Sequence, residues 1–181
     1  MPANTGLRAD QQRVVSIRRS WDARETPGVV RRVGAVWALV QVIDDLRLDG
    51  WECLRLADVA RVRRGEAERF AEHVLRRTRR LSAPAAPLDT TSRLLSWLAR
   101  RRMVALECEG DRDFLLGRIL EVDDEAALVQ SIDVGGCWRT WATRVTLTDV
   151  TRVAFGDHSA RMYARHGSRW CAPRRPARDR A

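Results

Sequence analysis

Short runs of apolar residues, many of them β-branched or alternating with polar ones, dominate the chain from residue 14 onward. Clusters of Gly, Asp and Glu separate these runs, a pattern typical of strands joined by tight turns. The runs predict strands at residues 14–19, 28–33, 37–43, 51–56, 60–63, 103–109, 115–122, 127–133, 141–148 and 151–155. The pattern therefore indicates a mainly β protein.

Two segments have the period of a helix instead. Residues 66–80 place their apolar side chains on one stripe, begin with glutamates and end with arginines, which complements the helix dipole. Residues 92–102 place leucines on one face and also end in arginines. Between them, residues 82–91 contain two prolines and several small residues, which predicts a linker.

The two halves of the chain repeat one pattern about 90 residues apart. Identical residues occupy the aligned positions Gly28/Gly117, Val33/Val122, Ala38/Ala127, Leu39/Leu128, Val40/Val129, Gln41/Gln130, Ile43/Ile132, Asp44/Asp133, Leu56/Leu147, Asp58/Asp149, Val59/Val150, Arg61/Arg152 and Val62/Val153. A period this long exceeds that of a solenoid repeat, so we expect each copy to form its own small core.

Residues 116–124 read Leu-Gly-Arg-Ile-Leu-Glu-Val-Asp-Asp, a glycine and an apolar strand followed by an acidic turn. With five strands and a flanking helix in each copy, this frame resembles a small SH3-like barrel of the Sm-like kind. The resemblance implies an α+β fold of two tandem five-stranded barrels. It divides the chain into a first barrel with its C-terminal helix at 1–81, the linker at 82–91, a second barrel with an N-terminal helix at 92–168, and a disordered basic tail at 169–181.

Sm-like proteins that bind RNA carry Asp and Asn in the turn after the second strand and an apolar-basic-glycine pattern before the fifth. Here the first position holds residues 34–36, Gly-Ala-Val, in one copy and residues 123–125, Asp-Asp-Glu, in the other. The basic-glycine sequence at residues 63–65 follows the predicted fifth strand. The resemblance therefore assigns no RNA-binding residue to this chain.

Several kinds of chemistry lack their residues. Four cysteines have no short paired spacing and three histidines form no cluster, so we expect no metal site, no cofactor and no catalytic activity. No small-molecule substrate is evident. The longest apolar run, residues 33–43, is shorter than the roughly 20 residues that cross a membrane. The N-terminal 13 residues have no apolar stretch typical of a secretory signal. We therefore expect a cytoplasmic protein without a membrane partner.

The formal charge is +9, and all 33 basic residues are arginines. Residues 1–81 carry a net charge of +6, and the segment from Arg169 to the end carries +4. Basic patches of this kind can contact phosphates. The candidate nucleic-acid-binding residues are Arg76, Arg77, Arg79 and Arg80 at the end of the first predicted helix, and Arg174 and Arg175 in the tail. A solvated helix end and a solubilising tail are the alternative interpretations.

Seven tryptophans accompany a single tyrosine. Alternation along residues 51–56 turns Leu54 and Leu56 inward and Trp51 outward, whereas Trp141 should point inward and Trp138 should lie near a hairpin tip. Exposed tryptophans can anchor a protein interface, so Trp51 and Trp138 are the candidate interface residues. Packing against the neighbouring barrel or helix is the alternative.

Acidic residues recur in the predicted turns, among them Asp44, Asp45 and Asp49. Turn chemistry accounts for them without catalysis. Asp58 and Asp149 precede the last strand of each copy, where we expect structural roles. The sequence thus indicates a non-catalytic binding or scaffolding module. Its partner is a nucleic acid such as RNA, or else another protein or further copies of the chain.

Overall fold

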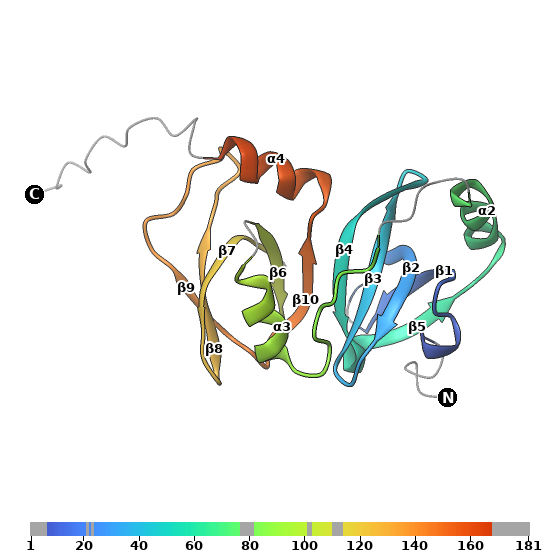
Figure 1. The fold of residues 1–181 in the computed structure, drawn as a ribbon, viewed down its shortest axis with the longest axis horizontal. Coiled ribbons are helices and arrows are strands. Elements are labelled where there is room, and N and C mark those ends of the chain that lie inside the picture. The colour runs from blue at the N-terminus through green and yellow to red at the C-terminus, as the bar shows by residue number, and fades with distance from the viewer. Residues whose placement is uncertain are drawn as a thin grey trace, which may run out of the picture.

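The computed structural model describes residues 7–20, 22, 24–76, 82–100, 103–109 and 114–167. Its strands form one antiparallel sheet in the order β5-β1-β2-β3-β4-β10-β6-β7-β8-β9 (Figure 1). The strands are β1 Val14–Arg19, β2 Glu25–Val33, β3 Trp37–Asp44, β4 Arg47–Arg55, β5 Val59–Arg63, β6 Val104–Cys108, β7 Phe114–Val122, β8 Ala126–Ser131, β9 Thr143–Thr146 and β10 Val150–Phe155. The mainly β prediction is confirmed, and the predicted strand positions agree to within a few residues.

The helices are short. A 3-10 turn, η1 Leu56–Asp58, joins β4 to β5, and the α-helices are α2 Glu66–Leu75, α3 Thr91–Leu98 and α4 His158–His166. Thr90 accepts a hydrogen bond from Arg93 N at the start of α3, and Asp157 accepts one from Ala160 N at the start of α4. The hydrophobic pattern predicts α2 and α3 but not α4.

The prediction of two closed SH3-like, Sm-like barrels is wrong, because the sheet is open and continuous. Each set of five strands keeps its first, second, third and fourth strands adjacent and places its fifth beside its first. The fourth strand of the first set, β4, pairs with β10, the fifth strand of the second set. All ten strands therefore share one sheet with two free edges, β5 and β9. The tail predicted at residues 169–181 lies outside the described residues.

The repeat in the sequence is also a repeat in strand register. Gly28 lies opposite Val42, and its counterpart Gly117 lies opposite Ser131, the counterpart of Val42. A Cβ atom on Gly117 would lie 2.1 Å from the carbonyl oxygen of Gln130, and one on Gly28 would lie 2.8 Å from that of Gln41. Each glycine is therefore needed where two strands approach too closely for a side chain.

The two sets of strands build equivalent cores. Buried or partly buried residues match across the repeat as Val15/Val104, Ile17/Leu106, Val30/Ile119, Val33/Val122, Ala38/Ala127, Val40/Val129, Leu54/Val145, Leu56/Leu147, Val59/Val150 and Val62/Val153. Across the β4·β10 pair, Leu54 of the first core lies opposite Arg152, while Val153 of the second core lies opposite Cys53. Because successive side chains alternate between faces, the two cores lie on opposite faces of the sheet.

The second core continues onto the outer face of the first set of strands. Trp37, Leu39, Trp51 and Cys53 from β3 and β4 pack with the leucines of α3 and with Val153 and Phe155 of β10. Helices cover the remaining outer faces: α2 packs on β1 and β2 through Ala71 and Leu75, and α4 packs on the second set through Ala160 (Figure 1). Among the described residues, no helix is long and apolar enough to cross a membrane.

Asp58 and Asp149 lie at equivalent places before the fifth strands, and the Asp58 carboxylate has the structural role that the sequence predicts. The Asp58 carbonyl accepts a hydrogen bond from Ser20 N at 2.9 Å, and the Asp149 carbonyl accepts the equivalent bond from Glu109 N at 2.7 Å. The buried Asp58 carboxylate also pairs with Arg55 at 2.6 Å. These contacts fix the entry into the fifth strand of each set.

Candidate binding cavity at the joint of the sheet

Ion pairs connect the two sets of strands where β4 meets β10. Arg152 of β10 reaches across the joint to Glu52 of β4 and also pairs with Glu107 of β6. Burial works against the charged guanidinium of Arg152, but these two carboxylates outweigh it and raise its pKa above the ordinary value. Arg152 is therefore held as a cation at the centre of the joint.

A second arginine reaches the same carboxylates from β1. The buried side chain of Arg19 lies 2.6 Å from Oε2 of Glu107 and 2.9 Å from Oδ2 of Asp22. Partial burial opposes the ionisation of Asp22, but hydrogen bonds from Arg24 N and from Arg19 outweigh it and lower the pKa of this carboxyl. The network connects β1, β4, β6 and β10, strands that come from both copies of the repeat.

Above this network lies a half-open cavity of about 540 Å³, which we call the acidic cavity. Three arginines line it, namely Arg19, Arg24 and Arg152. Eight carboxylates line it as well, from Asp22, Glu25, Asp44, Asp45, Asp49, Glu52, Glu107 and Asp157. Trp51 forms part of the wall. The strand ends, the β3–β4 turn and the start of α4 bring these residues together.

The acidic cavity remains negative after its ion pairs are counted. The lining carries five more carboxylates than arginines. Two further arginines pair with it from outside the lining, Arg63 with Glu25 at 2.9 Å and Arg161 with Asp49 at 3.3 Å. Counted over the described residues, an excess of three negative charges is left, in a chain whose overall charge is +9. Asp44 and Asp45, at the exposed rim, contribute two of the eight carboxylates.

Glu52 in the lining has an unused acceptor. Its side chain is only 6% exposed, and Oε1 pairs with Arg152. Its other carboxylate oxygen, Oε2, is buried without a hydrogen-bond partner among the described residues. A buried carboxylate oxygen without a donor is costly, so a donor brought in by a ligand would lower the free energy of the site.

The arrangement suits binding of cations through hydrogen bonds. Carboxylates accept two hydrogen bonds from a guanidinium, and an ammonium can donate to several of them at once. Concave surfaces lined by one sign of charge concentrate the electrostatic field and attract the opposite charge. Within the described ranges, no group of three or more His, Cys, Asp or Glu side chains is arranged to hold a metal ion.

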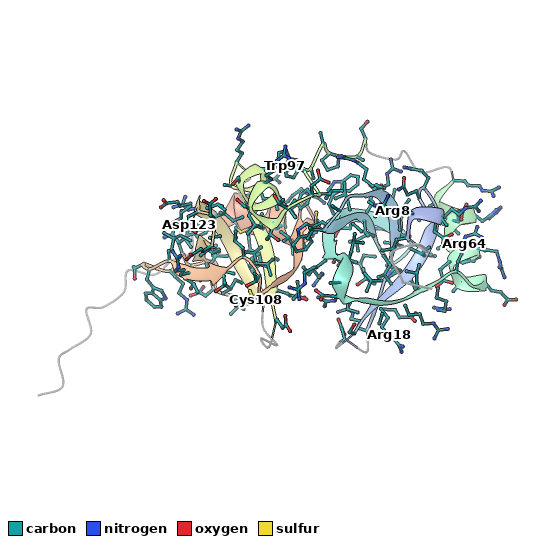
Figure 2. All side chains as sticks on the ribbon, turned by 90° about the horizontal axis from the view of Figure 1, so that it is seen from below. Arg8, Arg18, Arg64, Trp97, Cys108 and Asp123 are labelled. Carbon is teal, nitrogen blue, oxygen red and sulfur yellow. The ribbon has the colours of Figure 1, made fainter. Side chains whose placement is uncertain are left out.

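The predicted nucleic-acid-binding residues are mostly beyond the described residues. Arg76 is exposed and ends α2, where its backbone N donates to the carbonyl of His73. Arg77, Arg79, Arg80, Arg174 and Arg175 all lie outside the described residues. Figure 2 shows other arginines, Arg8, Arg18 and Arg64, around the end of the molecule that β1–β5 form. A phosphate-binding role for Arg76 remains a prediction.

The predicted interface tryptophans occupy different environments. Trp51 lies on the outward face of β4, as predicted, but it is only 8% exposed and packs in the second core, which agrees with the alternative of packing against neighbouring elements. Trp138 is half-buried beside α4, with the guanidinium of Arg118 5.0 Å from its ring centre. Trp141 is 54% exposed, contrary to the inward orientation predicted for it, because β9 begins only at Thr143. The interface roles of Trp51 and Trp138 remain predictions.

Several acidic residues of the cavity stand out in the sequence, but the cavity itself does not. Asp44, Asp45 and Asp49 were each explained by turn chemistry, and Glu52 and Glu107 are ordinary strand residues by pattern. Only the pairing of β4 with β10 brings them together. Searches with the sequence and the structure found no matching protein family, curated protein or solved structure.

Proposed function

We propose that this chain is a non-catalytic binding module whose acidic cavity receives a cationic segment of a partner protein. The observation that carries the proposal is the excess of carboxylates around a concave site of about 540 Å³ at the joint of the sheet. The cytoplasm remains the proposed compartment.

The negative charge of the cavity favours a protein over a nucleic acid at this site. Phosphates would meet the carboxylates of Asp44, Asp45 and Asp49 and be repelled, whereas arginine or lysine side chains would be attracted. Each exposed ion pair contributes roughly 0.2–1 kcal/mol, so several are needed for measurable binding. A few such pairs sum to no more than about 4 kcal/mol, so we expect a dissociation constant on the order of 1 mM for a short peptide with two arginines.

The test is fluorescence anisotropy of a labelled peptide with two adjacent arginines, titrated with the full chain at low and moderate salt. Binding should weaken as salt rises, because the attraction is between charges. The double substitution D44N/D45N removes two rim charges, and Asn tolerates the positive φ of 44° at Asp45. It should weaken binding several-fold.

The matched control is D124N/E125Q, which removes two exposed charges from a turn outside the cavity lining. It should leave the affinity close to that of the parent chain. Equal losses in both variants would show a general charge effect and contradict the proposal. Binding of mixed RNA but not of the peptide, unaffected by D44N/D45N, would assign the chain to the nucleic-acid alternative.

A further inference from the structure

The acidic cavity continues into two further hollows along α4. The second hollow, of about 790 Å³, shares Arg152, Ala154, Asp157 and Ser159 with the acidic cavity. The third hollow, of about 360 Å³, shares Val134 and Tyr163 with the second. Because they share these lining residues, the three hollows lie next to one another along α4, and we call them together the groove.

The chemistry changes along this groove. The second hollow is mixed: apolar and aromatic side chains such as Phe114, Leu116 and Ile132 line it together with two carboxylates and two arginines, Asp133, Asp157, Arg139 and Arg152. The described residues that line the third are Met162, Tyr163, His166 and residues of small loops, and none of these carries a carboxylate. Exposed apolar side chains mark this end, with Phe114 58% and Val134 95% exposed. The groove is therefore acidic at the start of α4 and apolar at its end.

From this arrangement we infer that the partner segment is extended and amphipathic along its length, with a cationic and an apolar residue about four positions apart. The inference rests on the proposed function and specifies its partner. The charge of the acidic cavity selects the cation, and the exposed Phe114 and Val134 offer apolar surface that a segment anchored there would cover.

The spacing follows from the length of α4. Nine helical residues rise about 1.5 Å each, or roughly 13 Å in total. An extended segment advances about 3.3 Å per residue, so roughly four residues span that distance. A cation in the acidic cavity would thus place an apolar side chain four or five positions along in the second or third hollow.

Three labelled peptides of equal charge test this with the full chain. The first has two arginines, three glycine or serine residues, and two leucines. The second replaces both leucines by serine, and the third places the leucines directly beside the arginines. The first peptide should bind about tenfold tighter than the other two, because it alone reaches the apolar end while its cations remain in the acidic cavity.

The substitution Phe114→Ser should remove the advantage of the first peptide and leave the second unaffected. Its control is Phe70→Ser on α2, since Phe70 has nearly the same exposure, 59% against 58%, and lies outside the groove. An equal effect of both substitutions would overturn the inference.

Other outcomes separate this inference from the proposed function. If all three peptides bound equally and D44N/D45N weakened their binding, the inferred spacing would be wrong, whereas the proposed binding of a cation in the acidic cavity would still hold. Binding of none would overturn both proposals. If R174S/R175S in the full chain tightened peptide binding, the occupant of the groove would be the chain's own C-terminal segment. If the chain self-associated and D44N/D45N abolished that self-association, the occupant would be a second copy of the chain. Either result would overturn the inference of a separate partner.

Discussion

Replacing Arg152 by Met tests whether the joint of the sheet depends on its central ion pairs. Arg152 pairs with Glu52, whose side chain is 6% exposed, and with Glu107, which is 21% exposed. Without the guanidinium, Glu52 would keep a buried charge with no cation beside it. Breaking a buried ion pair in this way costs about 3–5 kcal/mol.

We expect a smaller loss here, about 2–3 kcal/mol of unfolding free energy, because the Arg152 side chain is itself 27% exposed. For a chain of this size, that loss corresponds to a drop in Tm of about 5–10 °C. Urea unfolding followed by tryptophan fluorescence measures it, since Trp51 lies in the core beside the joint.

The repeat supplies a matched control at Arg61, the counterpart of Arg152. Arg61 is exposed on the edge strand β5, so Arg61→Met should change stability by less than about 0.5 kcal/mol. Adding Glu52→Gln to Arg152→Met should recover part of the loss by removing the unpaired charge. Equal, small effects at positions 152 and 61 would refute the reasoning that the ion pairs support the joint.

Two further predictions concern Gly117, where two strands approach closely, and the stability of the fold at acidic pH. Gly117→Ala should destabilise the fold by about 1–3 kcal/mol in urea unfolding, because its Cβ would lie 2.1 Å from Gln130 O; Gly135→Ala, whose nearest neighbour is 3.3 Å away, should cost much less. Burial opposes the charge of Glu68, but hydrogen bonds from Ser16 and Gly65 outweigh it and lower its pKa below the ordinary 4.5. Its charged form therefore stabilises the fold above about pH 4.5, and this contribution should disappear as pH falls through the lowered pKa. The stability difference between the parent and Glu68→Gln, measured by urea unfolding from pH 7 to pH 3, should shrink over the acidic part of that range; a constant difference would contradict this account.

The sequence was sufficient to predict the strands, the repeat and the alternation of faces. Leu54 and Leu56 do point into the first core, and Trp51 does lie on the other face of β4. That outer face is nevertheless buried, because α3 and β10 pack against it. Alternation identifies a face of a strand, but it carries no information about what covers that face.

The pairing of β4 with β10 could not be predicted for a related reason. Arg152 and Glu52 are 100 residues apart in the chain, and a strand pattern is the same whether its neighbour is local or distant. A fourth and a fifth strand suggested closure within one copy, whereas the structure pairs the fourth strand of one copy with the fifth of the other. The acidic cavity forms at this pairing and was missed with it.

The same long-range pairing has a consequence for the order of folding. Strands β1 to β4 can pair as successive hairpins, but β4 must wait for β10, which lies about 100 residues further along. Contacts of large sequence separation form slowly, because the loop between them must first be closed. During synthesis, Trp51 and Cys53 lack the β10 side of their core until about 100 further residues have been made. The interval before β10 arrives is therefore when the growing chain is most exposed to aggregation.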